Sequence, residues 1–124
     1  MEHRFTIQEQ IVFVIIHFNK YIMRQYTTLE QTDHLIFLEF PKPTSTTIET
    51  HGGYKETVNR YSIGELLSFL EEYVDDPSEE LLVWKDTVFW YVRLSSDTVG
   101  AGYDPELINA LYKYLVELKN EGVI

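Results

Sequence analysis

Acidic side chains gather in one part of this sequence. Between Tyr61 and Trp84 the chain carries seven carboxylates and no lysine or arginine. Acids at the C-terminal end of a helix face its negative dipole end, which costs some tenths of a kcal/mol each. A solvated surface is the plain interpretation, and an acidic patch that docks on a basic protein by electrostatic steering is the functional one. The candidate partner-binding residues are Glu71, Glu72, Asp75, Asp76, Glu79 and Glu80.

Patterns for catalysis and metal binding are weak. The acidic run has no glycine for a calcium loop, the four histidines do not form a His-Glu-x-x-His pair, and the chain has no cysteine. Ser95 or Ser96 with His51 and Asp97 could be written as a nucleophilic triad, but there is no Gly-x-Ser-x-Gly elbow. We therefore expect no catalytic residue, no cofactor and no metal, and favour a protein that is not an enzyme.

A glycine loop is the second candidate site. Gly100, Gly102 and Tyr103 follow an expected strand and lead into a helix N-terminus, where free N–H groups can hold an anion. Asp97 and Asp104 would repel phosphate, and the loop has neither a dinucleotide fingerprint nor a P-loop lysine. The plain interpretation is a connection whose glycines allow turning. The alternative is a small-ligand-binding or enzymatic domain that uses the loop from Gly100 to Asp104.

Charge and hydropathy limit the partners. Twenty acids stand against ten lysines and arginines, a net charge of −10, and the basic residues are scattered. This disfavours direct nucleic-acid binding and attachment to anionic membranes, and it favours a basic protein partner. The N-terminus does not resemble a secretory signal, and the longest apolar run, residues 11–16, is far short of a membrane span. We expect a cytoplasmic protein.

Aromatic residues make up 15% of the chain, and most of them are expected in the core. Exposed aromatic rings commonly anchor protein interfaces. Our candidates for such surface positions are Tyr54, Tyr61, Tyr91, Tyr103 and Tyr112.

The first element expected from the sequence is a helix over residues 7–24. Thr6 and Glu9 have the spacing of a capping box, and the apolar residues that follow recur at helical spacing. Val12, Phe13 and Ile16 lie off that stripe, so this helix is either central in the fold or half of a homodimer interface. Many β-branched residues leave a strand as the alternative.

Strands are expected next. Residues 26–33 are a polar connection, residues 34–40 an apolar strand that ends before Pro41, and residues 45–50 a second strand. His51, Gly52 and Gly53 are typical of a hairpin turn, after which residues 54–61 return as a third strand near an edge.

The second half of the chain gives sharper signals. Ser62 and Glu65 form a capping box with Tyr61 and Leu66 placed as a hydrophobic staple, which predicts a helix over residues 63–75. Residues 81–94 hold both tryptophans and are expected to form two strands of a hairpin, with one long bent strand as the alternative. A last helix is expected with Asp104 as N-cap, Pro105 in the first position and Gly122 as its end.

Together these patterns predict a single α+β domain over residues 1–124, with a mostly antiparallel sheet of about five strands and three helices. We favour a small acidic protein-binding module, such as an inhibitor or immunity-type antagonist of a basic, nucleic-acid-handling protein. Its alternatives are the ligand-binding or enzymatic domain above and a homo-oligomeric structural protein joined through helix 7–24.

Overall fold

A computed structural model describes residues 23–72, 78–97 and 100–124 and confirms the α+β class. In these residues, five antiparallel strands are divided between two sheets, in the orders β1-β2 and β3-β4-β5. The expected helix 7–24 lies outside the described residues except for Met23 and Arg24, which have no regular secondary structure. The elements are α2 (Leu29–Phe37), β1 (Ser45–His51), β2 (Tyr54–Arg60), α3 (Ile63–Glu71), β3 (Leu81–Lys85), β4 (Trp90–Leu94), β5 (Gly102–Asp104) and α4 (Leu107–Asn120).

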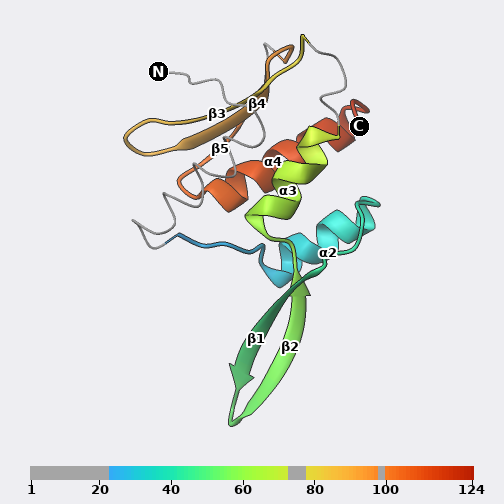
Figure 1. The fold of residues 1–124 in the computed structure, drawn as a ribbon, viewed down its shortest axis with the longest axis vertical. Coiled ribbons are helices and arrows are strands. Elements are labelled where there is room, and N and C mark those ends of the chain that lie inside the picture. The colour runs from blue at the N-terminus through green and yellow to red at the C-terminus, as the bar shows by residue number, and fades with distance from the viewer. Residues whose placement is uncertain (1–22, 73–77, 98–99) are drawn as a thin grey trace.

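The body of the molecule is layered. The three-stranded sheet lies over α3 and α4, and α2 lies on the far side of these two helices (Figure 1). Alternate residues of β4 are buried against the helices, because neighbouring side chains of a strand face opposite ways. In β3 the three consecutive residues Leu81, Leu82 and Val83 are all buried. The fully buried centre combines these strand residues with the apolar faces of α3 and α4, and includes Leu66, Leu70, Val92, Leu111 and Leu115.

Helix α3 begins where the sequence predicts. Ser62 accepts a hydrogen bond from the backbone of Glu65, and the Glu65 carboxylate accepts one from the backbone of Ser62. The same carboxylate accepts the backbone N–H groups of Thr44 (2.9 Å) and Ser45 (3.3 Å) and both of their hydroxyls. Glu65 therefore caps α3 and also fixes the start of β1.

The titration of Glu65 gives a first testable prediction. Burial alone would raise its pKa, but the hydrogen bonds from Ser45, Thr44 and Ser62 outweigh burial and hold the pKa below its ordinary value. A carboxyl whose pKa is lower in the folded than in the unfolded state contributes stability above its unfolded pKa, and this is lost as pH falls through the folded pKa. In urea unfolding, we expect Glu65→Gln to cost about 2 kcal/mol at neutral pH and progressively less on acidification through the carboxyl range. A cost that stays the same from neutral to acid pH would contradict this role.

The prediction for residues 26–40 was wrong. The polar connection and the strand are replaced by helix α2, which starts with a capping box of Thr28 and Gln31. Only one side of the apolar run is buried: Leu35 is fully enclosed, whereas the side chain of Phe37 is 81% exposed. A pattern with one buried side at helical spacing suits a surface helix better than a buried strand.

The hairpin over residues 81–94 is confirmed as two strands. Its turn uses no glycine, because the Asp86 carboxylate accepts the backbone N–H groups of Val88 (2.8 Å) and Phe89 (2.7 Å). Aspartate stabilises turns by hydrogen-bonding in this way to backbone groups just after it.

The last helix starts later than predicted. The N-cap is Glu106 and the helix begins at Leu107, whereas Asp104 ends a short strand, β5, that the sequence did not reveal. Asp104 still accepts the backbone N–H of Glu106 at 2.9 Å. Gly122 adopts the left-handed conformation (φ +74°) just after the helix C-cap, as expected.

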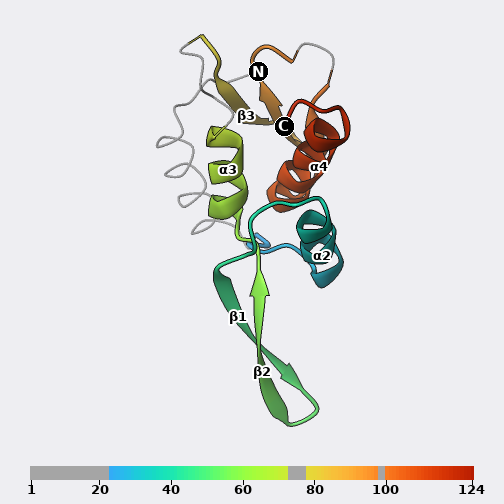
Figure 2. The same cartoon turned by 90° about the vertical axis from the view of Figure 1, so that its right-hand side faces the viewer.

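Strands β1 and β2 form a twisted two-stranded ribbon that projects from the body (Figures 1 and 2). Gly52 and Gly53 make its two-residue turn with φ values of +51° and +97°, which glycine adopts without steric cost. The predicted strands and turn are confirmed here, but the ribbon is separate from the three-stranded sheet.

Candidate functional site

The C-terminal ends of the three described helices meet at one end of the helix layers. Phe40, just after α2, stacks on Phe69 of α3 with ring centroids 5.6 Å apart, and the ammonium of Lys119 of α4 lies 5.5 Å from the Phe40 ring. Helices α3 and α4 run in similar directions and finish near the C-terminus of the chain (Figures 1 and 2). Three negative dipole ends therefore lie close together.

This end carries four exposed carboxylates, and we call it the acidic end. They are Glu39 after α2, Glu71 and Glu72 at the end of α3, and Glu121 at the end of α4. Burial, together with the charges of Glu121 and Asp97, raises the pKa of nearby Glu117 above its ordinary value, as a negative local potential should. Phe37, the last residue of α2, presents a large apolar ring to solvent.

The predicted acidic run is only partly seen at the surface. Glu71, Glu72 and Glu80 are exposed, whereas Asp75 and Asp76 lie outside the described residues.

Glu79 is held by hydrogen bonds. It accepts the Ser95 hydroxyl and the Ser96 backbone N–H, both at 2.9 Å. Burial would raise the pKa of Glu79, but these hydrogen bonds outweigh it and lower the pKa. Glu79 therefore fixes the loop after β4.

Two residues of the acidic end, Glu39 and Glu121, were not predicted from the sequence.

The glycine loop is organised by internal contacts. Gly100 donates its N–H to Asp97 at 3.1 Å, and Asp97 also accepts the hydroxyl of Tyr114 at 2.9 Å. A Cβ atom on Gly102 would lie 2.3 Å from the carbonyl oxygen of Ala110 and 2.6 Å from Cβ of Tyr114. Gly102 is thus required for close packing of β5 on α4, which accounts for it without a ligand.

Exposed aromatic rings lie at several places. The side chain of Tyr103 is 56% exposed, and its ring stacks on that of Tyr91 with centroids 6.1 Å apart. The side chain of Tyr54, on the ribbon, is 63% exposed. The expectation that Tyr61 lies on the surface was wrong: it is fully buried, donates its hydroxyl to the Pro41 carbonyl at 2.6 Å, and burial raises its pKa to about 12.

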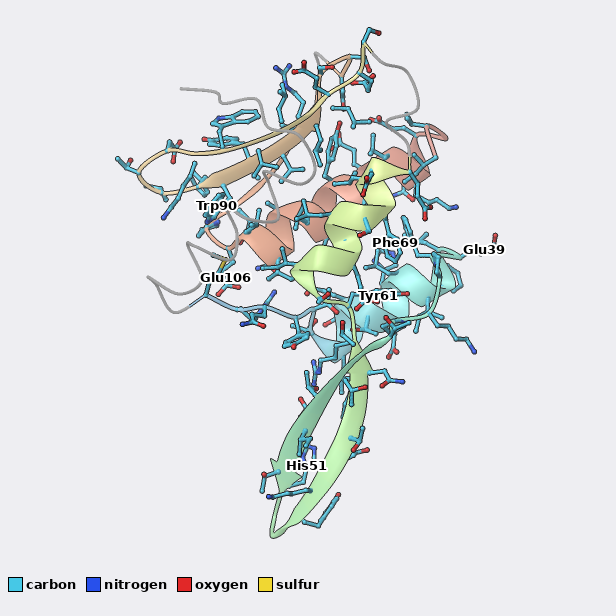
Figure 3. The ribbon with its side chains drawn as sticks, viewed as in Figure 1. Glu39, His51, Tyr61, Phe69, Trp90 and Glu106 are labelled. Carbon is cyan, nitrogen blue, oxygen red and sulfur yellow. The ribbon has the colours of Figure 1, made fainter. Side chains whose placement is uncertain are left out.

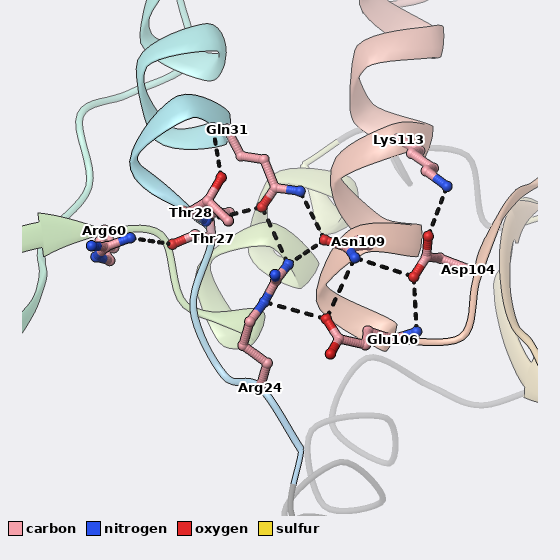
Figure 4. Close-up of polar contacts among 9 residues, drawn as sticks. All are labelled: Arg24, Thr27, Thr28, Gln31, Arg60, Asp104, Glu106, Asn109 and Lys113. Atoms are coloured by element: carbon pink, nitrogen blue, oxygen red, sulfur yellow. Dashed lines mark hydrogen bonds and ion pairs between the residues drawn. The ribbon is translucent and has the colours of Figure 1, made fainter.

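A polar junction joins α2 to α4 and was not foreseen. The guanidinium of Arg24 contacts Gln31, Asn109 and Glu106, and Gln31 donates to Asn109 at 2.8 Å (Figure 4). The Asn109 amide continues the network to Asp104, which also binds Lys113. The described partners of these side chains all lie within the chain, although among the described residues Arg24 Nε makes only its ion pair with Glu106 and no hydrogen bond. We therefore interpret the junction as structural.

The residues of the nucleophilic triad lie apart. His51 is on the ribbon, where it contacts Glu56 at 3.3 Å, whereas Ser95 follows β4 at the opposite end of the molecule (Figures 1 and 3). In the described parts of the chain, no group of three or more histidines and carboxylates is placed to hold a metal ion.

An open hollow of about 230 Å³ lies at the root of the ribbon. Arg60 lines it, but its guanidinium already binds the carbonyl of Thr27 at 3.1 Å and the carboxylate of Glu49. The hollow therefore offers no strong argument for a particular ligand.

Comparisons with known proteins leave the function open. No family model, curated protein or solved structure matches the chain. Among the described residues, no helix has the length and hydrophobicity needed to span a membrane.

Proposed function

We propose that this protein is a small non-enzymatic module that binds a basic protein through the acidic end. The observation that carries the proposal is the meeting of three helix C-termini around Glu39, Glu71, Glu72 and Glu121. Acids at negative dipole ends reduce stability slightly. Four of them in one place are more readily explained by an interaction than by folding.

The distribution of cations supports the same interpretation. Arg24, Arg60 and Lys113 form ion pairs elsewhere on the chain. At the acidic end, the ammonium of Lys119 lies over an aromatic ring. The four carboxylates outnumber the ammonium of Lys119, so we infer a negative potential at this end, which attracts a positively charged surface and accelerates encounter.

Phe37 supplies the apolar component that such an interface needs. Charged residues steer and orient the partners, whereas buried aromatic anchors commonly provide much of the binding energy. A basic surface that normally binds phosphate groups would accept the carboxylates in their place. The partner class that fits is a nucleic-acid-handling protein, and this chain would act as its inhibitor or immunity-type antagonist.

A pull-down from the native host tests the proposal. The bait is compared with the double variant Glu71→Gln and Glu72→Gln. The control double variant Glu30→Gln and Glu56→Gln changes net charge equally at exposed positions at the start of α2 and on the ribbon. We expect a basic protein to be retained by the wild type and the control but lost by the acidic-end variant. Equal recovery by all three baits, or recovery of no basic protein, would contradict the proposal.

A further inference from the structure

In the described residues, one edge of β1 has no partner strand. Within the part of the chain that the structure describes, β1 is paired with β2 alone. In an antiparallel ladder closed by a two-residue turn, alternate residues direct their N–H and C=O groups away from the partner strand. In β1 these residues are Thr46, Ile48 and Thr50.

Strand β1 has few of the features that protect a strand edge, and its one carboxylate, Glu49, is bound to Arg60 of β2. The strand is seven residues long and contains no proline, no lysine and no bulge in its pairing with β2. Natural proteins usually block a long exposed edge with such features, because it otherwise pairs with another strand. Ile48 lies at the centre of β1 and its side chain is 71% exposed. A two-stranded ribbon alone is only marginally stable in water, so further strand pairing would stabilise it.

The sequence of β1 is complementary to itself about Ile48. In an antiparallel pair of two β1 strands centred there, Ile48 faces Ile48, Thr46 faces Thr50, and Thr47 faces Glu49. The three positions with outward backbone groups then face one another, and each such pair exchanges two hydrogen bonds. Apolar and threonine pairs favour this register, and no like charges stand directly opposite.

We propose that β1 pairs with β1 of a second copy of this chain, giving a four-stranded sheet in the order β2-β1-β1-β2. Strand β2 is the poorer edge, because its symmetric register places Thr57 against Thr57 and Lys55 against Asn59, without an apolar pair at the centre. The ribbon lies away from the acidic end, so the dimer is independent of the proposed partner and leaves the acidic end free (Figure 1).

Sedimentation velocity of the full chain over a wide concentration range tests this dimer. We expect a reversible wild-type dimer whose dissociation constant rises at least ~10-fold in Ile48→Lys, because two ammonium groups then stand opposite each other. Ile48→Glu should act similarly, and an equal mixture of the two variants should restore association. Thr57→Lys is the matched control, since Thr57 is the register partner of Ile48 on β2 and should leave the dimer intact.

Cysteine cross-linking gives an independent measurement, because the chain has no cysteine of its own. Facing residues of a hydrogen-bonded antiparallel pair have Cα atoms about 5.5 Å apart, within disulfide range. Ile48→Cys should form a covalent dimer under mild oxidation, and Thr57→Cys should not. A monomeric wild type, a dimer that survives Ile48→Lys, or cross-linking through Thr57→Cys instead would overturn the proposal.

Discussion

Gly102→Ala is expected to destabilise the protein by about 3 kcal/mol, the upper part of the range for overpacking a buried site. The added Cβ would lie 2.3 Å from the Ala110 carbonyl oxygen and 2.6 Å from Cβ of Tyr114. Neither obstacle is a flexible side-chain end, so β5 must move away from α4. Urea unfolding measured at neutral pH gives the free-energy difference directly.

Gly100→Ala is the matched control in the same loop. Its Cβ would approach Glu117 Oε1 at 2.8 Å, but this atom is the end of a side chain that can turn aside. We expect a change within about 0.5 kcal/mol. Equal losses of unfolding free energy in the two variants would contradict the packing role of Gly102 and would favour the ligand-loop hypothesis instead.

Phe37→Ala is expected to lower affinity for the basic partner about 30-fold, the loss typical of an aromatic interface anchor. The Phe37 ring is 81% exposed, so its removal leaves no cavity in the core. Stability should change by no more than about 0.5 kcal/mol. Titration calorimetry with the captured partner, together with urea unfolding, separates the two effects.

Tyr54→Ala controls for the loss of any exposed aromatic ring. Tyr54 is 63% exposed but lies on the ribbon, away from the acidic end. Its replacement should leave partner affinity unchanged. If Tyr54→Ala weakens binding and Phe37→Ala does not, the interface lies on the ribbon rather than at the acidic end.

Local sequence signals predicted local structure well. The capping box of Ser62 and Glu65 correctly placed the start of α3, and the paired glycines at 52 and 53 correctly placed the ribbon turn. Helix α2 was missed although Thr28 and Gln31 carry the same type of capping signal, because the apolar run after them resembled a strand. Strand β5 has three residues and depends on pairing with β4, which no local pattern encodes.

The candidate site depended more heavily on tertiary structure. Glu71 and Glu72 were predicted from their place in an acidic run, but Glu39 and Glu121 join them only because three helices finish together. Glu79 was indistinguishable from its acidic neighbours in sequence, since its bonds to Ser95 and Ser96 come from a distant loop. Gly100 and Gly102 were predicted as part of a ligand loop, and in the structure they take part in a turn and in close packing.

Nuclear magnetic resonance of the isotope-labelled protein, titrated with the captured basic partner, tests the acidic end most directly. Amide signals of Phe37, Glu39, Glu71, Glu72 and Glu121 should shift or broaden together on binding. Signals of the ribbon around Thr57 should stay in place. Shifts confined to the ribbon or the glycine loop, with an unchanged acidic end, would contradict the proposed binding surface.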